Sequence, residues 1–370
     1  MTQTTVKDVI RVLEDFAPPE LAFEGDRIGL HVGSMNAKVN KVMIALDVLE
    51  EVVDEAIKKN VNLIIAHHPL IFKPLKSIDL NSDKGRIIQK LLQHQISVYA
   101  AHTNLDITSG GVNDMLMNQL GIELTDVLVE TGEEKLYKLV VFTPETHENE
   151  LRDALSEAGA GHIGDYSHCT FMTPGTGTFK PLIGTNPYIG SQGELERVSE
   201  VRMETIAPEH LLKRVIHAAE EAHPYEEMAY DVYPENITGS KHGLGRIGEL
   251  ENKITLKELC QHVKQSFNVP FVRAVGDPNK KVKKVAIIGG DGNKFINQAK
   301  IKGADVLITG DVYYHTAHDA LGIGLPMIDP GHHIEKVMKT ELAKILQEKT
   351  TSLDVDIVSS ETVTEPFQVF

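Results

Sequence analysis

Histidine, aspartate and glutamate residues follow four short apolar stretches of the sequence, LIIA, ISVYAA, ADVLIT and LPMID. Imidazole and carboxylate groups together are typical ligands of zinc, iron and manganese, and a carboxylate can bridge two ions. If each stretch is a strand, its carboxyl end is where open α/β sheets bind ligands. The candidate residues at these four ends are His67, His68, His102, Asp106, Asp311, His315, His318, His332, His333 and Glu335.

Each candidate taken alone also has a structural explanation. A His-His pair can end a polar loop, and Asp106 can cap a turn. His332 and Glu335 can be a solvated pair on one helix face. His315 and His318 fit a helix surface, or a place behind the ligands, better than direct coordination. The same chemistry at four strand ends nevertheless favours a metal site.

The pattern of apolar residues predicts an α/β fold with a mainly parallel sheet. Continuous apolar runs alternate with helical segments of about ten residues, as in βαβ units. An amphipathic helix precedes them and ends before Pro18 and Pro19. The predicted strands are 42–46, 61–66, 96–101, 285–289, 304–309 and 325–329, and the predicted helices are 49–59, 84–94, 293–302, 312–321 and 332–348.

The two regions rich in strands resemble each other. Aligned without gaps, residues 42–68 and 285–311 share one hydrophobic pattern, with identical residues at Val42/Val285, Ile44/Ile287, Ala56/Ala299, Lys59/Lys302 and Ile65/Ile308. Two βαβ scaffolds can match in this way by chance, but a duplicated module is the better interpretation. We therefore expect two related βαβ-type halves that form one metal-binding unit.

The region between these halves has a different composition. A strand (136–144) and a helix (145–158) precede a stretch rich in Gly, Thr and Pro, and a helix (207–222) and a strand (228–234) follow it. This βαββαβ order predicts an inserted α+β domain of the ferredoxin-like type. The expected linkers are 131–135 and 236–243, and the expected domain ranges are 1–130, 131–237 and 238–370.

The composition limits the classes of function. The chain has 370 residues, with 37 Lys and Arg against 53 Asp and Glu, so its formal net charge is −16. That charge argues against tracking along a nucleic-acid backbone. The sequence shows no signal peptide and no apolar run long enough to span a membrane, so we expect a cytoplasmic protein. The two cysteines, Cys169 and Cys260, exclude a disulfide framework.

Other segments that look like motifs fail the test of their context. Residues 243–248 fit G-x-G-x-x-G, but they follow a polar loop instead of a strand, so a dinucleotide site is not expected. Residues 289–294 lack the spacing of a phosphate-binding P-loop. Tyr225, Glu226 and Glu227 are expected at the junction before an edge strand.

Motifs along the whole chain resemble those of the Nif-three-like family, whose members are often named GTP cyclohydrolase type-two homologues. The motifs AHHP, HTNLD and GH…E occur in the order typical of the family. The chain most resembles the long bacterial form, which carries an inserted ferredoxin-like module similar to PII-type signalling proteins. The matching segments are 25–33, 46–56, 64–72, 100–106, 222–234, 243–250, 306–320 and 329–336.

This resemblance implies two related α/β halves around a dinuclear metal centre, in a toroidal homo-hexamer. The centre would hold two divalent ions, with zinc preferred over iron or manganese. Some members place the last His and Glu four residues apart, whereas His332 and Glu335 are three apart, so His333 remains an alternative to His332. By position, the implied ligands are His67, His68, Asp106, His332 and Glu335, with His102 and His315 behind them.

The resemblance also implies a hydrolase that acts on GTP. A hydroxide bridging the two ions would attack C8 of the guanine ring and expel formate. The same centre would also serve the hydrolysis of a phosphoester or another cyclic amide. A further alternative is a metal-binding regulator or metallochaperone without catalysis, whose insert senses a small molecule. The expected partner is thus a small-molecule substrate or effector, with GTP as the named candidate.

Overall fold

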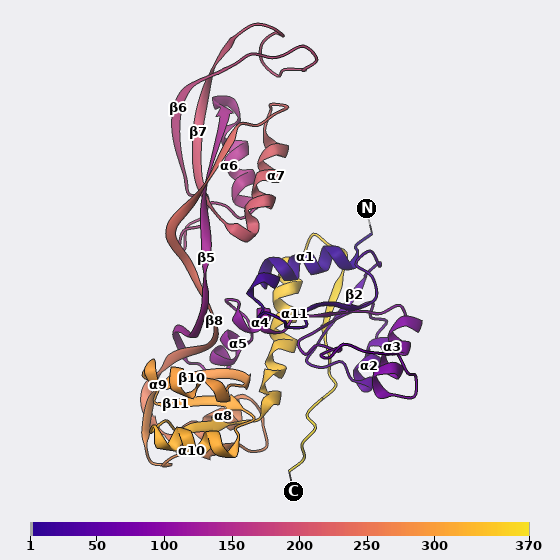
Figure 1. The fold of residues 1–370 in the computed structure, drawn as a ribbon, viewed down its shortest axis with the longest axis vertical. Helices are drawn as coiled ribbons and strands as arrows, with labels where there is room; N and C mark the ends of the chain where they lie inside the picture. The colour runs from indigo at the N-terminus through magenta and orange to yellow at the C-terminus, as the bar shows by residue number, and fades with distance from the viewer. Residues whose placement is uncertain (1–2, 370) are drawn as a thin grey trace. The chain divides into compact units, whose positions relative to one another are not determined.

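The computed structural model describes residues 3–369, and the chain divides into two compact units (Figure 1). Unit 1 comprises Met1–Thr131 and His242–Phe370, and unit 2 comprises Gly132–Lys241. The strands β5 (Glu123–Pro144) and β8 (Tyr230–Thr255) run from one unit into the other. Within residues 3–369, no helix is long and apolar enough to cross a membrane.

The first sheet of unit 1 has the strand order β1-β4-β3-β2-β13. All neighbours are parallel except β1, which pairs antiparallel with β4 at one edge. Ala45 pairs with Ala66 and Ala66 with Ala100, so β2, β3 and β4 end side by side. The elements are α1 (Val6–Phe16), β1 (Gly29–Val32), β2 (Lys41–Ala45), α2 (Glu50–Lys58), β3 (Leu63–Ala66), α3 (Asp83–Gln93), β4 (Ser97–Ala100) and β13 (Asp356–Ser359).

The second sheet runs β8-β10-β11-β12-β9 within unit 1. β10, β11 and β12 are parallel, whereas β8 and β9 pair antiparallel with their neighbours. All six predicted strands are therefore present, each within a few residues of its expected bounds. The elements are α8 (Leu256–Ser266), β9 (Arg273–Val275), β10 (Lys281–Asp291), α9 (Ile296–Ile301), β11 (Val306–Gly310), α10 (Tyr314–Gly322), β12 (Met327–Asp329) and α11 (Val337–Lys349).

One hydrophobic core lies between the two sheets and explains why the strands are apolar throughout. Ile44 of β2 and Ile287 of β10 both face this core, together with α5 (Val112–Gln119) and α11. The residues next to Ile44 and Ile287 in the chain point to the opposite face of each sheet, where each sheet has a separate core with its own helices. Figure 1 shows α11 between the two sheets. A strand buried on both faces needs an apolar residue at every position.

A buried ion pair joins the two parts of unit 1. The Arg246 side chain on β8 is only 2% exposed, and its Nη2 atom lies 2.6 Å from Oδ2 of Asp114 on α5. The guanidinium also donates to the carbonyl groups of Gly243, Gly245, Ile107 and Thr108. The G-x-G-x-x-G segment thus lies inside a strand, and it supplies carbonyl acceptors to a structural arginine.

Unit 2 has the element order β5-α6-β6-β7-α7-β8, and its strands lie in the order β6-β7-β5-β8. β7 pairs antiparallel with both β5 and β6. The core of the unit joins apolar residues of the strands to both helices. The additional elements are α6 (Glu148–Glu157), β6 (Thr170–Phe179), β7 (Glu196–Pro208) and α7 (Leu212–Ala222).

Three segments of secondary structure differ from the expectation. Residues 131–135 and 236–243 lie inside β5 and β8 instead of forming linkers, because these strands are hydrogen-bonded neighbours in one sheet. The helix expected from residue 207 begins at Leu212, because the pairing of β7 with β5 continues as far as Pro208. Backbone pairing of this kind overrides weak local preferences.

Candidate metal centre

Six side chains from three places in unit 1 meet at the carboxyl ends of the central strands. His67 and His68 directly follow β3, and His102 is the N-cap of the short helix α4 (Thr103–Ile107), which carries Asp106. His332 and Glu335 lie on the 3₁₀ helix η5 (His332–Lys336), after β12. A 3₁₀ helix has three residues per turn, so residues three apart share one face. The spacing between His332 and Glu335 therefore suits the turn that carries them.

The ligand atoms fall into two groups that share one histidine. His67, His68 and Glu335 form one group, and His67, His102 and Asp106 form the other; the ligand atoms of each group lie within 4.8 Å of one another. The Nε2 atom of His68 lies 3.0 Å from Oε2 of Glu335. Two adjacent groups of this composition can hold divalent transition-metal ions.

Each of four imidazole rings is held through its Nδ1 atom, which leaves Nε2 facing the centre. The Nδ1 atom of His67 lies 3.0 Å from the Ala101 carbonyl oxygen. Carboxylates take this role for the other three rings, at 2.7 to 2.9 Å, in the pairs His68–Asp47, His102–Asp26 and His332–Asp311. Histidines that bind metals almost always have such a partner, which fixes the ring and its tautomer.

Two buried atoms in the centre lack the partner that a metal ion would supply. Nε2 of His67 and Oδ1 of Asp106 have no hydrogen bond to any described residue. A buried polar atom without a partner costs free energy, more so when the group is charged. The unsatisfied atoms and the composition of the two groups therefore fit a bound cation.

The electrostatics of the metal-free centre also favour positive charge. Burial alone would raise the pKa of Glu335, but the close contacts with His332 and His68 and the nearby His67 ring hold it well below its ordinary value. Burial would lower the pKa of His68, but Asp47 and Glu335 outweigh it and raise the pKa to about 10. Contact with Glu335 raises the pKa of His332 to about 9 despite burial. Without metal, protons on these rings balance the carboxylates.

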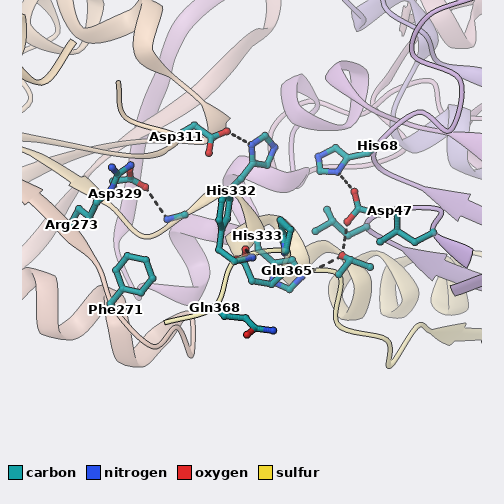
Figure 2. A pocket seen from close by; sticks show the side chains of 16 residues that line it. Asp47, His68, Phe271, Arg273, Asp311, Asp329, His332, His333, Glu365 and Gln368 are labelled. Atoms are coloured by element: carbon teal, nitrogen blue, oxygen red, sulfur yellow. Dashed lines mark hydrogen bonds and ion pairs between the residues drawn. The ribbon is translucent and has the colours of Figure 1, made fainter. Parts of the chain in front are cut away.

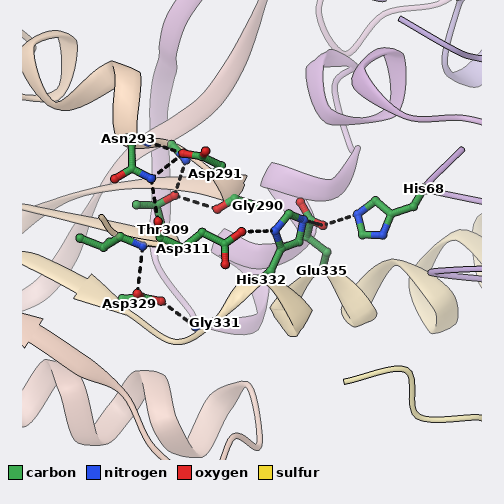
Figure 3. Close-up of polar contacts among 12 residues, drawn as sticks. His68, Gly290, Asp291, Asn293, Thr309, Asp311, Asp329, Gly331, His332 and Glu335 are labelled. Carbon is green, nitrogen blue, oxygen red and sulfur yellow. Dashed lines mark hydrogen bonds and ion pairs between the residues drawn. The ribbon is translucent and has the colours of Figure 1, made fainter. Parts of the chain in front are cut away.

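Gly290 lets the backbone approach the candidate ligands closely. A Cβ atom added at Gly290 would lie 2.9 Å from Oε1 of Glu335 and 3.2 Å from Nε2 of His332. Gly290 also has a φ angle of +60°, which favours glycine. Figure 3 shows Gly290 among the polar contacts around His332 and Glu335. Gly290, in the segment 289–294, thus lies beside the candidate metal centre, although the segment has no phosphate-binding spacing.

The structure brings most of the predicted site residues together, but not all of them. His67, His68, Asp106, His332 and Glu335 converge, and His102, which was expected behind the ligands, contributes to the second group. The side chain of His333 points elsewhere, with Nε2 3.5 Å from Oγ1 of Thr364. His315 and His318 are exposed on α10, where both rings pack against Tyr314.

Two of the three carboxylates that orient the imidazoles, Asp26 and Asp47, were not predicted as part of the site. Asp47 follows directly after β2, so its position at a strand end was a usable signal. Asp311 stands at the end of β11 and was noted only as a candidate ligand. Asp26 lies in a loop after a 3₁₀ turn, where no periodic pattern marks it.

A pocket of about 790 Å³ opens beside the centre. Figure 2 shows His68 and His332 facing each other in this pocket, and their ring centroids are 5.2 Å apart. Phe271, Arg273 and the C-terminal residues 364–368 complete the wall. The carboxylate of Glu55 fixes the chain just before these residues by accepting hydrogen bonds from Ser360 and Thr362.

Comparison with known proteins gives one consistent family. Residues 4–366 match the Duf34/NIF3 (NGG1p interacting factor 3) family. A Bacillus subtilis protein named GTP cyclohydrolase 1 type 2 homolog is 52% identical over 363 residues, which cover 98% of this chain and 97% of that protein. A Staphylococcus aureus protein of the same name is 38% identical over 98% of this chain and 99% of its own length.

Solved structures give the same result. The crystal structure of a Bacillus cereus protein related to NIF3 superimposes with a TM-score of 0.89 at 53% identity, over 100% of both chains. A Staphylococcus aureus crystal structure superimposes with a TM-score of 0.72 at 34% identity, also over 100% of both chains.

Proposed function

The chain belongs to the Duf34/NIF3 family, and we propose that it binds two divalent metal ions and uses them to hydrolyse a nucleotide of the GTP type. The observation that carries this proposal is the convergence of four imidazole rings on Glu335 and Asp106, each ring fixed from behind through Nδ1. The proposed ligands are His67, His68, Asp106, His332 and Glu335, with His102 as a further ligand of the second ion.

The donor set supports zinc first, with iron or manganese as alternatives. When bound, two such ions would supply Lewis acidity and lower the pKa of a coordinated water toward neutrality. The chain's own contribution is to fix the positions of the donors. Glu335 lies between His68 and His332, with its Oε2 atom 3.0 and 3.2 Å from their Nε2 atoms, so it would hold an ion together with these two rings.

The pocket beside the centre supports a substrate with both apolar and anionic parts. The rings of Phe271 and Phe367 are partly exposed in its wall and offer faces for a base to stack on. Arg273 is the only Lys or Arg among the described lining residues, and Asp329 already pairs with it. We therefore expect the anionic part of the substrate to depend mainly on the bound metal ions for its countercharge.

The names of the curated relatives are the reason for choosing GTP. Hydrolysis at C8 of guanine consumes two waters, breaks the C8–N7 and C8–N9 bonds and releases C8 as formate. The test is protein reconstituted separately with zinc, manganese and ferrous ions and incubated with GTP. We expect formate with at least one metal, and none with Glu335→Gln. If no metal supports formate release from GTP, the hydrolase assignment is wrong. Whether the protein binds metal is judged separately, by measuring its metal content.

A metal-binding regulator or metallochaperone without turnover is the second candidate. It is supported by a separate cavity in unit 2, whose lining residues all belong to that unit. Such a protein would bind and exchange metal but would hydrolyse neither GTP nor a panel of phosphoesters at full metal occupancy. Turnover of any of these substrates that disappears with Glu335→Gln would exclude it.

We also propose the finer architecture that the family resemblance implies. The element order of unit 2 and its strand order β6-β7-β5-β8 support a ferredoxin-like, PII-like insert at about residues 131–237. The flanking ranges 1–130 and 238–370 would be related halves of one metal-binding unit. The expected assembly is a homo-hexamer, and light scattering coupled to size-exclusion chromatography measures its mass directly.

A further inference from the structure

We propose that unit 2 contains a second binding site, which takes a small organic ammonium compound with an aromatic or branched apolar body. The site is a cavity of about 330 Å³ beside the end of β6 and the segment that follows α7. Its volume is at the lower end of the range for small-molecule sites. This inference goes beyond the proposed function and is independent of the metal centre.

Aromatic rings form much of the cavity wall. Tyr225 lies at their middle, with its ring centroid 5.5 Å from that of Phe179 and 6.3 Å from that of Tyr188. Phe142 also lines the cavity, but the Arg202 guanidinium covers one face of its ring at 5.6 Å. The faces of such rings attract cations through their quadrupole, and the attraction is stronger where water is excluded.

A buried carboxylate sits next to these rings. Glu200 on β7 is 9% exposed, and its Oε1 atom accepts a hydrogen bond of 3.0 Å from the Tyr225 hydroxyl. No Lys, Arg or His among the described residues forms an ion pair with Glu200. Its other oxygen lies against Gly177, where an added Cβ atom would be only 2.0 Å from Oε2. The carboxylate therefore occupies a confined place and has one neutral donor as its partner.

The titratable neighbours do not neutralise this charge. Burial and then the Glu200 carboxylate raise the pKa of the Tyr225 hydroxyl above its ordinary value, so the hydroxyl remains a neutral donor. Burial lowers the pKa of His223. The ring of His223 is also fixed, because one nitrogen donates to the Phe142 carbonyl and the other accepts from the Tyr225 amide. His223 is therefore a neutral structural residue and not the counterion.

The charge of the whole lining points to a cation. The described residues that line the cavity include three glutamates but only one lysine, namely Glu200, Glu226 and Glu227 against Lys180. A buried carboxylate without a counterion is costly, and a bound ammonium group would supply both the charge and the hydrogen bonds. The rings would cover the apolar body of the same ligand. An anionic ligand of equal size would meet repulsion instead.

The test compares phenethylammonium with 2-phenylethanol, its neutral counterpart, in titration calorimetry on the full-length protein. We expect saturable binding of one phenethylammonium per chain, at least about tenfold tighter than binding of the alcohol. Glu200→Gln keeps the shape of the side chain and should abolish that preference. Tyr225→Phe keeps the ring and the Glu200 charge, so it should retain the preference for phenethylammonium.

The matched control is Glu221→Gln, which removes the same charge from an exposed position of α7 in unit 2. We expect it to leave the affinity for phenethylammonium unchanged. The proposal is overturned if phenethylammonium does not bind saturably, if the alcohol binds equally well, or if Glu200→Gln binds like the parent. Metal content should be equal in all these variants, so the outcome does not depend on the metal centre.

Discussion

The Nε2 atom of His67 lies 3.5 Å from the Oδ1 atom of Asp106, and both atoms are buried. Neither atom has a hydrogen bond within the described part of the chain. Burial would lower the pKa of His67, yet the Asp106 and Glu335 carboxylates together raise it. Burial also raises the pKa of Asp106. In the absence of metal, burial and the nearby Glu335 carboxylate therefore oppose a negative charge on Asp106. A cation close to Asp106 and His67 would offset this cost.

Asp106→Asn should separate metal binding from folding. We expect its metal affinity to fall by more than the roughly 10–100-fold typical for residues that only orient a ligand. The metal-free variant should be at least as stable as the metal-free parent, because a buried charge is removed. Metal content by elemental analysis and urea unfolding of the metal-free proteins give the two quantities.

Asp356→Asn is the control for Asp106→Asn, because the Asp356 side chain is exposed and pairs with Lys41 at the surface. It should leave metal content unchanged. Parental metal affinity in Asp106→Asn would contradict the assignment of Asp106 as a ligand.

Metal affinity should rise with pH. The pKa values of about 10 for His68 and about 9 for His332 mean that both rings hold protons at pH 7 in the metal-free protein. A metal ion must displace these protons, so acid competes with binding and alkali favours it. For each proton that the metal displaces, we expect the apparent metal affinity to increase about tenfold per pH unit between pH 6 and 8.

Competition with a chelator, corrected for the chelator's own protonation, measures this slope. His332→Gln should reduce the slope by about one displaced proton. His333→Gln is its matched neighbour and should not change the slope, because burial lowers the pKa of His333 and leaves it neutral. Affinity that does not vary with pH would contradict the proposed ligands.

The carboxylate of Asp311 should matter through His332 alone. Asp311 has a φ angle of +52°, so glycine and asparagine both suit its backbone conformation. Asp311→Gly removes the acceptor for Nδ1 of His332, and we expect about 10–100-fold weaker metal binding. Asp311→Asn keeps an acceptor oxygen and should lose less metal affinity than Asp311→Gly. Equal metal affinities of the two variants would show that Asp311 does not position His332.

The sequence was sufficient to predict the central strands, and it places the candidate metal site at their carboxyl ends. Ile44 and Ile287 belong to apolar runs that only a strand buried on both faces requires, and ligands follow such runs in α/β sheets. The family resemblance implies His67, His68 and Glu335 as ligands, and the structure brings these candidates within one group.

Other features depend on contacts between distant parts of the chain. β13 pairs with β2 through Asp356 and Lys41, and nothing local in either segment specifies the other. Asp26 orients His102 from a loop 76 residues earlier, so only the folded chain reveals it. The strand character of residues 131–135 likewise comes from hydrogen bonds to neighbouring strands and not from their own composition.

The ion pair between Arg246 and Asp114 should be the most sensitive polar contact in unit 1. Arg246→Met leaves Asp114 buried without its counterion and removes the donors to four carbonyl groups. We expect a loss of about 3–5 kcal/mol in the free energy of unfolding. Urea denaturation followed by circular dichroism measures it.

A second substitution shows whether the loss of stability comes from the unpaired buried carboxylate or from a lost packing contact. If the cost of Arg246→Met comes mainly from the uncompensated carboxylate, adding Asp114→Asn should restore part of the stability, because the double variant buries no unpaired charge. Lys283→Met breaks the exposed pair with Glu249 and serves as the control, with an expected change of about 1 kcal/mol or less. A double variant less stable than Arg246→Met would show that Asp114 stabilises unit 1 without Arg246.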